Sequence, residues 1–189
     1  ELVGEKVTLA TQEALHNVRN QYLEVGTKLI GASIRSGEQI AFLAGLDVLT
    51  IPPAAIEQFL KMEHTVFMGS HVEKDIQPGI DLSHPYAIRF PKLWEIPDSF
   101  IRFVDDLLAK TKLDCMSGEE LELICNEQSI DLFYPFSNSE LKKIFNQGKI
   151  PNLEDWSQEV ALDDLMTRSA LQSFSKDQGA LDDRIRLFL

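Results

Sequence analysis

Two short apolar segments with a helical segment between them constrain the fold of this chain more than any other feature. The segments are 27–34 and 47–51, and the residues between them, 36–45, have the apolar spacing of a helix. In both segments apolar residues occupy neighbouring positions, so apolar side chains point to both faces of the strand. This is typical of strands that are covered on both faces. The order strand, helix, strand is typical of a βαβ unit, so the sequence predicts an α/β fold with a parallel sheet.

Two further helices are predicted on either side of this unit, at 9–25 and 54–62. The middle helix has the start of a capping box, since Ser36 is followed three residues later by Gln39. The helix at 54–62 follows Pro53, a residue type favoured at the first position of a helix. Residues 1–62 are therefore predicted to form one set of βα units.

The rest of the chain has a different character. Residues 63–97 contain prolines and little periodicity, and we expect an irregular surface segment there. Further helices are predicted at 98–109, 118–126, 138–146 and within 154–189. We therefore expect an irregular and helical insertion over 63–153 and C-terminal helices over 154–189.

A parallel pair of strands cannot form a stable sheet by itself. It leaves two open edges and uncovered faces, although these strands have the composition of buried ones. We therefore expect neighbouring strands from sequence outside this chain. The first residue is Glu1 and not methionine, so we also expect that this is not the natural start.

The residues at the end of the first predicted strand could bind a phosphate group. In α/β folds ligands bind at the carboxyl ends of the strands. Gly31 and Ala32 allow close approach, Ser33 provides a hydroxyl, and Arg35 provides a guanidinium suited to phosphate. The following helix start is expected to add free N–H groups. The pattern alone also fits a surface arginine beside a capping serine.

The sequence around this motif resembles the transaldolase family. The similarity is carried by 30–35 (IGASIR), 38–40 (EQI) and 43–53 (LAGLDVLTIPP), and a weaker similarity to the closing helix of that family covers 161–185. The resemblance implies the C-terminal part of a (β/α)8 TIM barrel, comprising its last two strands, with a mainly helical insertion and a closing C-terminal helix. Two positions depart from the family pattern, Ile34 in place of an aromatic residue and Leu46 in place of a frequent cysteine.

The resemblance also implies a function. Transaldolases are cytoplasmic enzymes of the pentose phosphate pathway that need no cofactor and move a dihydroxyacetone unit between sugar phosphates through a Schiff base on a lysine. Ser33 and Arg35 match the positions that hold the substrate phosphate. The lysine and its acid–base carboxylates lie on earlier strands of the family, so we expect no catalytic residue in this chain and no turnover by the chain alone. The expected partners are a sugar phosphate and the remainder of the barrel.

Other classes of function are less compatible with the sequence. The net charge of −12 disfavours nucleic acids and anionic lipids, and no apolar run reaches the length of a membrane span. A signal peptide and a metal site are not expected either. The histidines and acids of 63–84 lack metal-ligand spacing, and the acidic pairs at 105–106, 163–164 and 182–183 are interpreted as solvated. The remaining alternative is a non-catalytic barrel fragment that binds a sugar phosphate or pairs with another chain.

Overall fold

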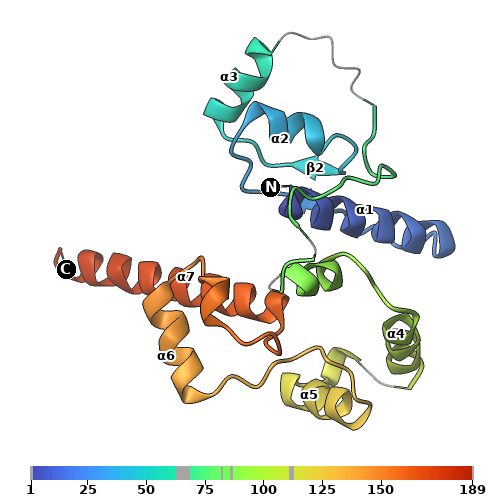
Figure 1. The fold of residues 1–189 in the computed structure, drawn as a ribbon, viewed down its shortest axis with the longest axis vertical. Helices are drawn as coiled ribbons and strands as arrows, with labels where there is room; N and C mark the ends of the chain where they lie inside the picture. The colour runs from blue at the N-terminus through green and yellow to red at the C-terminus, as the bar shows by residue number, and fades with distance from the viewer. Residues whose placement is uncertain (1, 63–68, 82, 86, 111–112, 189) are drawn as a thin grey trace. The chain divides into compact units, whose positions relative to one another are not determined.

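The computed structural model describes all residues except 1, 63–68, 82, 86, 111–112 and 189, and it divides into two compact units, 1–82 and 83–189 (Figure 1). The first unit contains α1 (Val3–Gln21), β1 (Ile30–Gly31), α2 (Gly37–Phe42), β2 (Val48–Leu49) and α3 (Pro53–Lys61). The second contains the 3₁₀ helices η1 (Ala87–Leu93), η2 (Leu113–Cys115) and η3 (Leu153–Asp155), and the α-helices α4 (Asp98–Lys110), α5 (Gly118–Glu127), α6 (Asn138–Gln147) and α7 (Leu162–Arg186).

The strands pair in parallel with a helix between them, which confirms the predicted βαβ order. Ile30 pairs with Val48 and Gly31 with Leu49. Each strand is two residues long, much shorter than the segments 27–34 and 47–51, and no third strand lies in the described part of the chain. The apolar side chains that were expected to be covered are open, since Ile30 is 58% and Val48 40% exposed. In the described part of the chain each strand has a strand neighbour on one edge only, so these side chains lack the cover that a complete sheet and its helices would give.

Helix α1 has different bounds from those predicted. It begins at Val3 and ends at Gln21, whereas 9–25 was expected. Its fully buried positions are Leu9 and Gln12, while Val18 is 41% exposed. The helix ends at Gln21, where the backbone becomes extended at Tyr22. The chain then returns beside the helix, where Arg19 donates to the carbonyl of Thr27. The core of the unit contains Leu9, Ile34, Ile40, Leu43, Ala55 and Val72.

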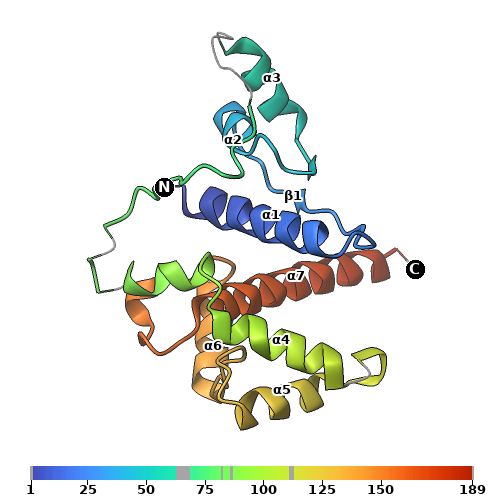
Figure 2. The same cartoon turned by 90° about the vertical axis from the view of Figure 1, so that its right-hand side faces the viewer.

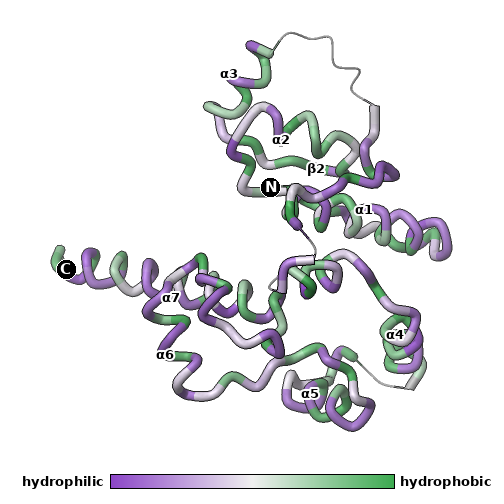
Figure 3. Tube along the Cα trace, viewed as in Figure 1, coloured by the Kyte–Doolittle hydropathy of each residue, from purple (hydrophilic) through white to green (hydrophobic). Residues whose placement is uncertain are grey.

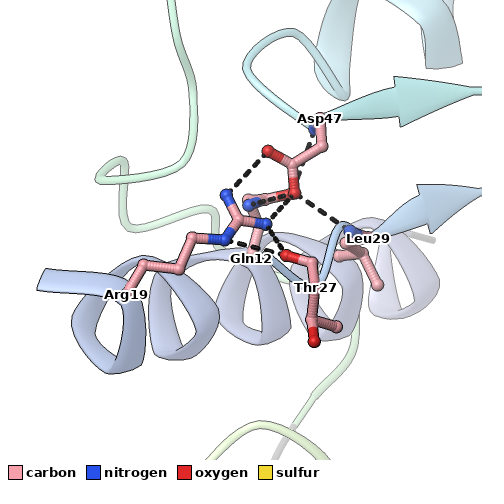
Figure 4. A network of polar contacts seen from close by, with 5 residues as sticks. All are labelled: Gln12, Arg19, Thr27, Leu29 and Asp47. Carbon is pink, nitrogen blue, oxygen red and sulfur yellow. Dashed lines mark hydrogen bonds and ion pairs between the residues drawn. The ribbon is translucent and has the colours of Figure 1, made fainter. Parts of the chain in front are cut away.

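One carboxylate, that of Asp47, joins α1 to the segments that lead into both strands (Figure 4). It receives two hydrogen bonds from Arg19, at 2.9 and 2.5 Å, and one from the backbone N–H of Leu29 at 2.9 Å. The buried Gln12 donates to the same carboxylate at 3.1 Å and accepts from the backbone N–H of Asp47 at 3.1 Å. Arg19 also donates to the carbonyl of Thr27. The network holds the strand pair against α1.

We expect Asp47→Asn to lower the stability of the first unit and to flatten its pH dependence. The Arg19 hydrogen bond, followed by that of Leu29, holds the pKa of the Asp47 carboxyl well below its usual range. A depressed carboxyl pKa stabilises the fold above the unfolded value of about 4, and this stabilisation is lost as the pH falls below it. The urea midpoint of the parent should therefore fall more steeply between pH 5 and about pH 3 than that of the variant.

Asp75→Asn provides the control for this measurement. Asp75 pairs with Lys6 at 3.0 Å, but its side chain is 75% exposed, so the pair adds little to stability. Equal urea midpoints for Asp47→Asn and Asp75→Asn at pH 7 would show that the network does not hold the unit together.

The start of α2 packs directly on α3. A Cβ atom at Gly37 would lie 2.5 Å from the backbone nitrogen of Phe59 and 2.9 Å from the backbone carbon of Gln58. The backbone N–H of Gly37 donates to the side chain of Gln58 at 3.2 Å. The chain can make this close approach because Gly37 has no side chain. The contact of Gly37 with α3 fixes the end of the Ser33–Ser36 loop, which contains the candidate phosphate-binding residues.

The second unit confirms two predicted helix starts. Ser117 with Glu120 and Ser137 with Glu140 form complete capping boxes at α5 and α6. Helix α6 packs on the start of α7, around a core of Ile144, Trp156, Val160 and Leu165 (Figure 2). The last helix begins at Leu162, since η3 and an extended segment occupy 153–161.

The C-terminal part of α7 is only partly covered by the described residues of its unit. Its buried residues, Leu162, Leu165 and Ser169, all lie in the first third of the helix. Hydrophobic and hydrophilic residues alternate along the rest (Figure 3), and Leu171, Phe174, Leu181 and Ile185 are about half exposed. Packing of this helix across a barrel stays a prediction. None of the described helices combines the length and apolarity needed to cross a bilayer.

Candidate functional site

Ser33 and Arg35 lie together at the carboxyl end of β1, as the sequence predicted. They line a hollow of about 180 Å³ in the first unit. Three elements form its walls: the first turns of α1 with Gly4, Glu5 and Thr8, the loop after β1, and α2 with Gln39 and Leu43. The hollow is therefore at the end of a parallel strand where α/β folds bind ligands.

Ser33 has an unusual backbone conformation. Its φ angle of 60° lies in the left-handed region, which residues with a side chain rarely adopt. Such a residue costs on the order of 1–3 kcal/mol and is common at ligand-binding sites. The residue is exposed, and no described residue forms a hydrogen bond with its hydroxyl. The hydroxyl is thus available to a ligand, at a cost to the stability of the loop.

We expect Ser33→Gly to stabilise the isolated chain by about 1 kcal/mol and to weaken phosphate binding. Glycine adopts a positive φ without strain but has no hydroxyl to donate. Ser33→Ala is the matched variant, because it also removes the hydroxyl and retains the strain. Urea unfolding should show a higher midpoint for the glycine variant only, and phosphate titration should show weaker binding for both. A glycine variant less stable than the parent would contradict this interpretation.

Arg35 lines the hollow, and its side chain has no partner among the described residues. Its backbone N–H donates to the side-chain oxygen of Gln39 at 2.8 Å, which fixes the loop to α2. The side chain is exposed and has no hydrogen bond or ion pair with any described residue. Arg35 is also the one lysine or arginine among the residues that line the hollow. Arg35 would therefore supply the positive charge that compensates the negative charge of a bound phosphate.

The hollow also contains one negative charge, that of Glu5. The amide nitrogen of Gln39 donates to the carboxylate of Glu5 at 2.8 Å, so Gln39 bridges α1 and the Arg35 loop. The Glu5 carboxylate repels an anion in the same hollow. Its hydrogen bond from Gln39 fixes the position of this negative charge. The site consequently favours an anion held on the side of Ser33 and Arg35.

The helix start that lines the hollow belongs to a different helix from the one expected. At the start of α2 the N–H of Gly37 is bonded to Gln58, and that of Gln39 to the Ser36 hydroxyl at 3.3 Å. The prediction that this helix start offers free donors is therefore wrong at these two positions. The first turn of α1 lines the hollow instead, and the first N–H groups of a helix have no partner within it. This contribution was not predicted, because the helix was expected to begin near residue 9 and begins at Val3.

The other candidates raised from the sequence lie outside this hollow. Lys28 is exposed two residues before β1, at the opposite end of the strand, and Lys61 ends α3. Lys142 and Lys143 belong to α6 in the second unit. The described residues contain no group of three side chains that could hold a metal ion, while Glu63 and His64 lie outside the described residues.

Comparisons with known proteins point to one family. Residues 3–88 match the family described as Transaldolase/Fructose-6-phosphate aldolase. A transaldolase from Chlamydia pneumoniae is 30% identical over 104 residues, which are 53% of this chain and 28% of that protein. The matched segment thus spans less than a third of the length of this relative. No solved structure matches the chain.

Proposed function

Because residues 3–88 belong to the Transaldolase/Fructose-6-phosphate aldolase family, we propose that this chain forms the last two βα units of a transaldolase-type (β/α)8 barrel and supplies its phosphate-binding end. In this proposal the complete enzyme transfers a dihydroxyacetone unit between sugar phosphates in the cytoplasm. The Schiff-base lysine and its acid–base carboxylates come from barrel strands outside these 189 residues. No cofactor is needed for this chemistry.

One observation carries the proposal: Ser33 and Arg35 lie free in the same hollow at the carboxyl end of a parallel strand. A hydroxyl and a guanidinium together can bind the oxygen atoms of a phosphate monoester. The unpartnered N–H groups at the start of α1 favour a negative charge in the same place. These groups would bind the distal phosphate of the ketose and so fix the position of its carbonyl group relative to the lysine.

The two-stranded sheet supports the proposal that further barrel strands come from outside this chain. Ile30 and Val48 expose apolar side chains that a neighbouring strand or helix would cover. Among the described residues each strand has a strand neighbour on one edge only, so the backbone groups of its other edge are open to the strands that closure of a barrel would add. In the proposed enzyme, these groups pair with strands that the rest of the barrel provides.

The proposal is tested by comparing the chain alone with the enzyme in which the remaining barrel strands are present. Transaldolase turnover of fructose 6-phosphate with an aldose phosphate acceptor should be measurable for the complete enzyme and absent for the chain alone. Turnover by the chain alone would overturn the division of roles proposed here.

A non-catalytic sugar-phosphate-binding fragment is the second candidate. It is favoured by the absence of a lysine among the residues that line the hollow. It requires that the chain binds a sugar phosphate and that adding the remaining strands restores no turnover. The same turnover measurement therefore distinguishes the two candidates.

A further inference from the structure

A second and larger cavity lies in the unit 83–189, apart from the site described above. It has a volume of about 560 Å³, which is within the range of small-molecule sites. Its walls come from η1, the start of α4, the loop after α5 and the segment before α7. Much of the lining is apolar, including Ile88, Leu93, Ile96, Phe100, Ile130 and Leu162.

Arg89 of η1 lines this cavity and is 7% exposed. One terminal nitrogen, Nη1, donates to the carbonyl of Ser157 at 2.7 Å and to that of Val160 at 3.0 Å. The other two nitrogens, Nε and Nη2, are buried and have no hydrogen-bond partner among the described residues. Burial lowers the pKa of this guanidinium. Arg89 is therefore a buried cation with three of its five N–H donors, one on Nε and two on Nη2, unused.

No carboxylate of the described residues compensates this charge. Glu95, Asp131, Glu159 and Asp163 line the cavity, but none of them forms an ion pair with Arg89. Asp131 instead pairs with the exposed Lys92 at 3.5 Å. Buried charges in proteins are normally paired, because an unpaired one loses its hydration without compensation. Nε and Nη2 form the side of a guanidinium that binds the two oxygens of a carboxylate or phosphate.

We propose that this cavity binds a small molecule that has one carboxylate or phosphate group and an apolar body. The oxyanion binds Nε and Nη2 of Arg89, and the apolar body lies against the hydrophobic wall. The four carboxylates of the wall repel molecules with several negative groups, so nucleotides and sugar bisphosphates are excluded. This ligand class is independent of the sugar-phosphate hollow at Ser33 and Arg35.

Isothermal titration of the 189-residue chain tests the proposal with three probes: hexanoate, butyl phosphate and hexanol. Hexanoate or butyl phosphate should bind at least tenfold more tightly than hexanol, which has a similar apolar chain and no oxyanion. The comparison of hexanoate with butyl phosphate identifies which oxyanion the site prefers. Arg89→Gln should remove the preference over hexanol, whereas Arg102→Gln should retain it because Arg102 is exposed and does not line the cavity.

Ser99→Trp keeps the test valid if Arg89→Gln does not fold. Ser99 is exposed and lines the cavity, so a large side chain there should block the ligand and leave Arg89 intact. Loss of hexanoate or butyl phosphate binding in this variant supports the proposal. Equal binding of hexanol and the anions, unchanged anion binding in both variants, or no anion binding at millimolar concentration would each overturn it.

Discussion

Arg35→Ala in the complete enzyme should raise the Michaelis constant for sugar phosphates by about 10- to 100-fold. A charge-assisted hydrogen bond contributes about 1.5–3 kcal/mol, and Arg35 is the one cation among the residues that line the hollow. The turnover number should change much less, because the guanidinium binds a phosphate far from the reacting carbonyl. Steady-state kinetics with fructose 6-phosphate measures both constants.

The same kinetics with an unphosphorylated ketose gives the control. That substrate has no group for Arg35 to bind, so its Michaelis constant should be nearly unaffected. Lys28→Ala is the matched variant. Lys28 is also an exposed cation, but it lies before the start of β1, at the end of the strand away from the hollow. Equal losses on phosphorylated and unphosphorylated ketoses would refute the assignment of Arg35 to the phosphate.

Gly37→Ala should destabilise the first unit by about 3 kcal/mol or more. The added Cβ atom would lie 2.5 Å from the backbone nitrogen of Phe59, and a backbone atom cannot move aside as the end of a side chain can. Separation of α2 from α3 would also remove the hydrogen bond between Gly37 and Gln58. Urea unfolding, monitored by circular dichroism, measures the loss.

Gly118→Ala is a closely matched control for this substitution. Both glycines are the first residue of a helix and follow a capping serine, Ser36 or Ser117. A Cβ atom at Gly118 would meet nothing within 4 Å. Its substitution should therefore leave the stability unchanged or raise it slightly. A similar loss from both substitutions would show that the contact between α2 and α3 is not the cause.

The elements that could be predicted from the sequence are those set by local chemistry. The predicted helix starts at 118 and 138, which follow the capping residues Ser117 and Ser137, and the start of α3 at Pro53 depend on residues within one turn, and the structure confirms them. The parallel pairing of β1 and β2 is also confirmed. It could be predicted because a helix between two apolar segments allows few other arrangements. The position of Ser33 and Arg35 at a strand end follows from the same order.

The features that the sequence did not reveal depend on contacts between distant residues. The early end of α1 accompanies the return of the chain beside the helix, where Asp47 binds Arg19 and Leu29. The contribution of the α1 start to the hollow could not be seen while the helix was expected to begin near residue 9. Arg89 lies in a segment that was expected to be irregular, and its burial depends on Ser157 and Val160, more than sixty residues later.

We infer that this chain binds the phosphate of a ketose and does not supply the lysine that bonds to its carbonyl. This division of roles is tested by mass spectrometry after incubation of the purified chain with fructose 6-phosphate and borohydride, with a complete transaldolase treated in parallel. We predict a covalent ketose adduct on the complete enzyme and none on any lysine of this chain. An adduct on a lysine of the chain, such as Lys28 or Lys61, would contradict the account.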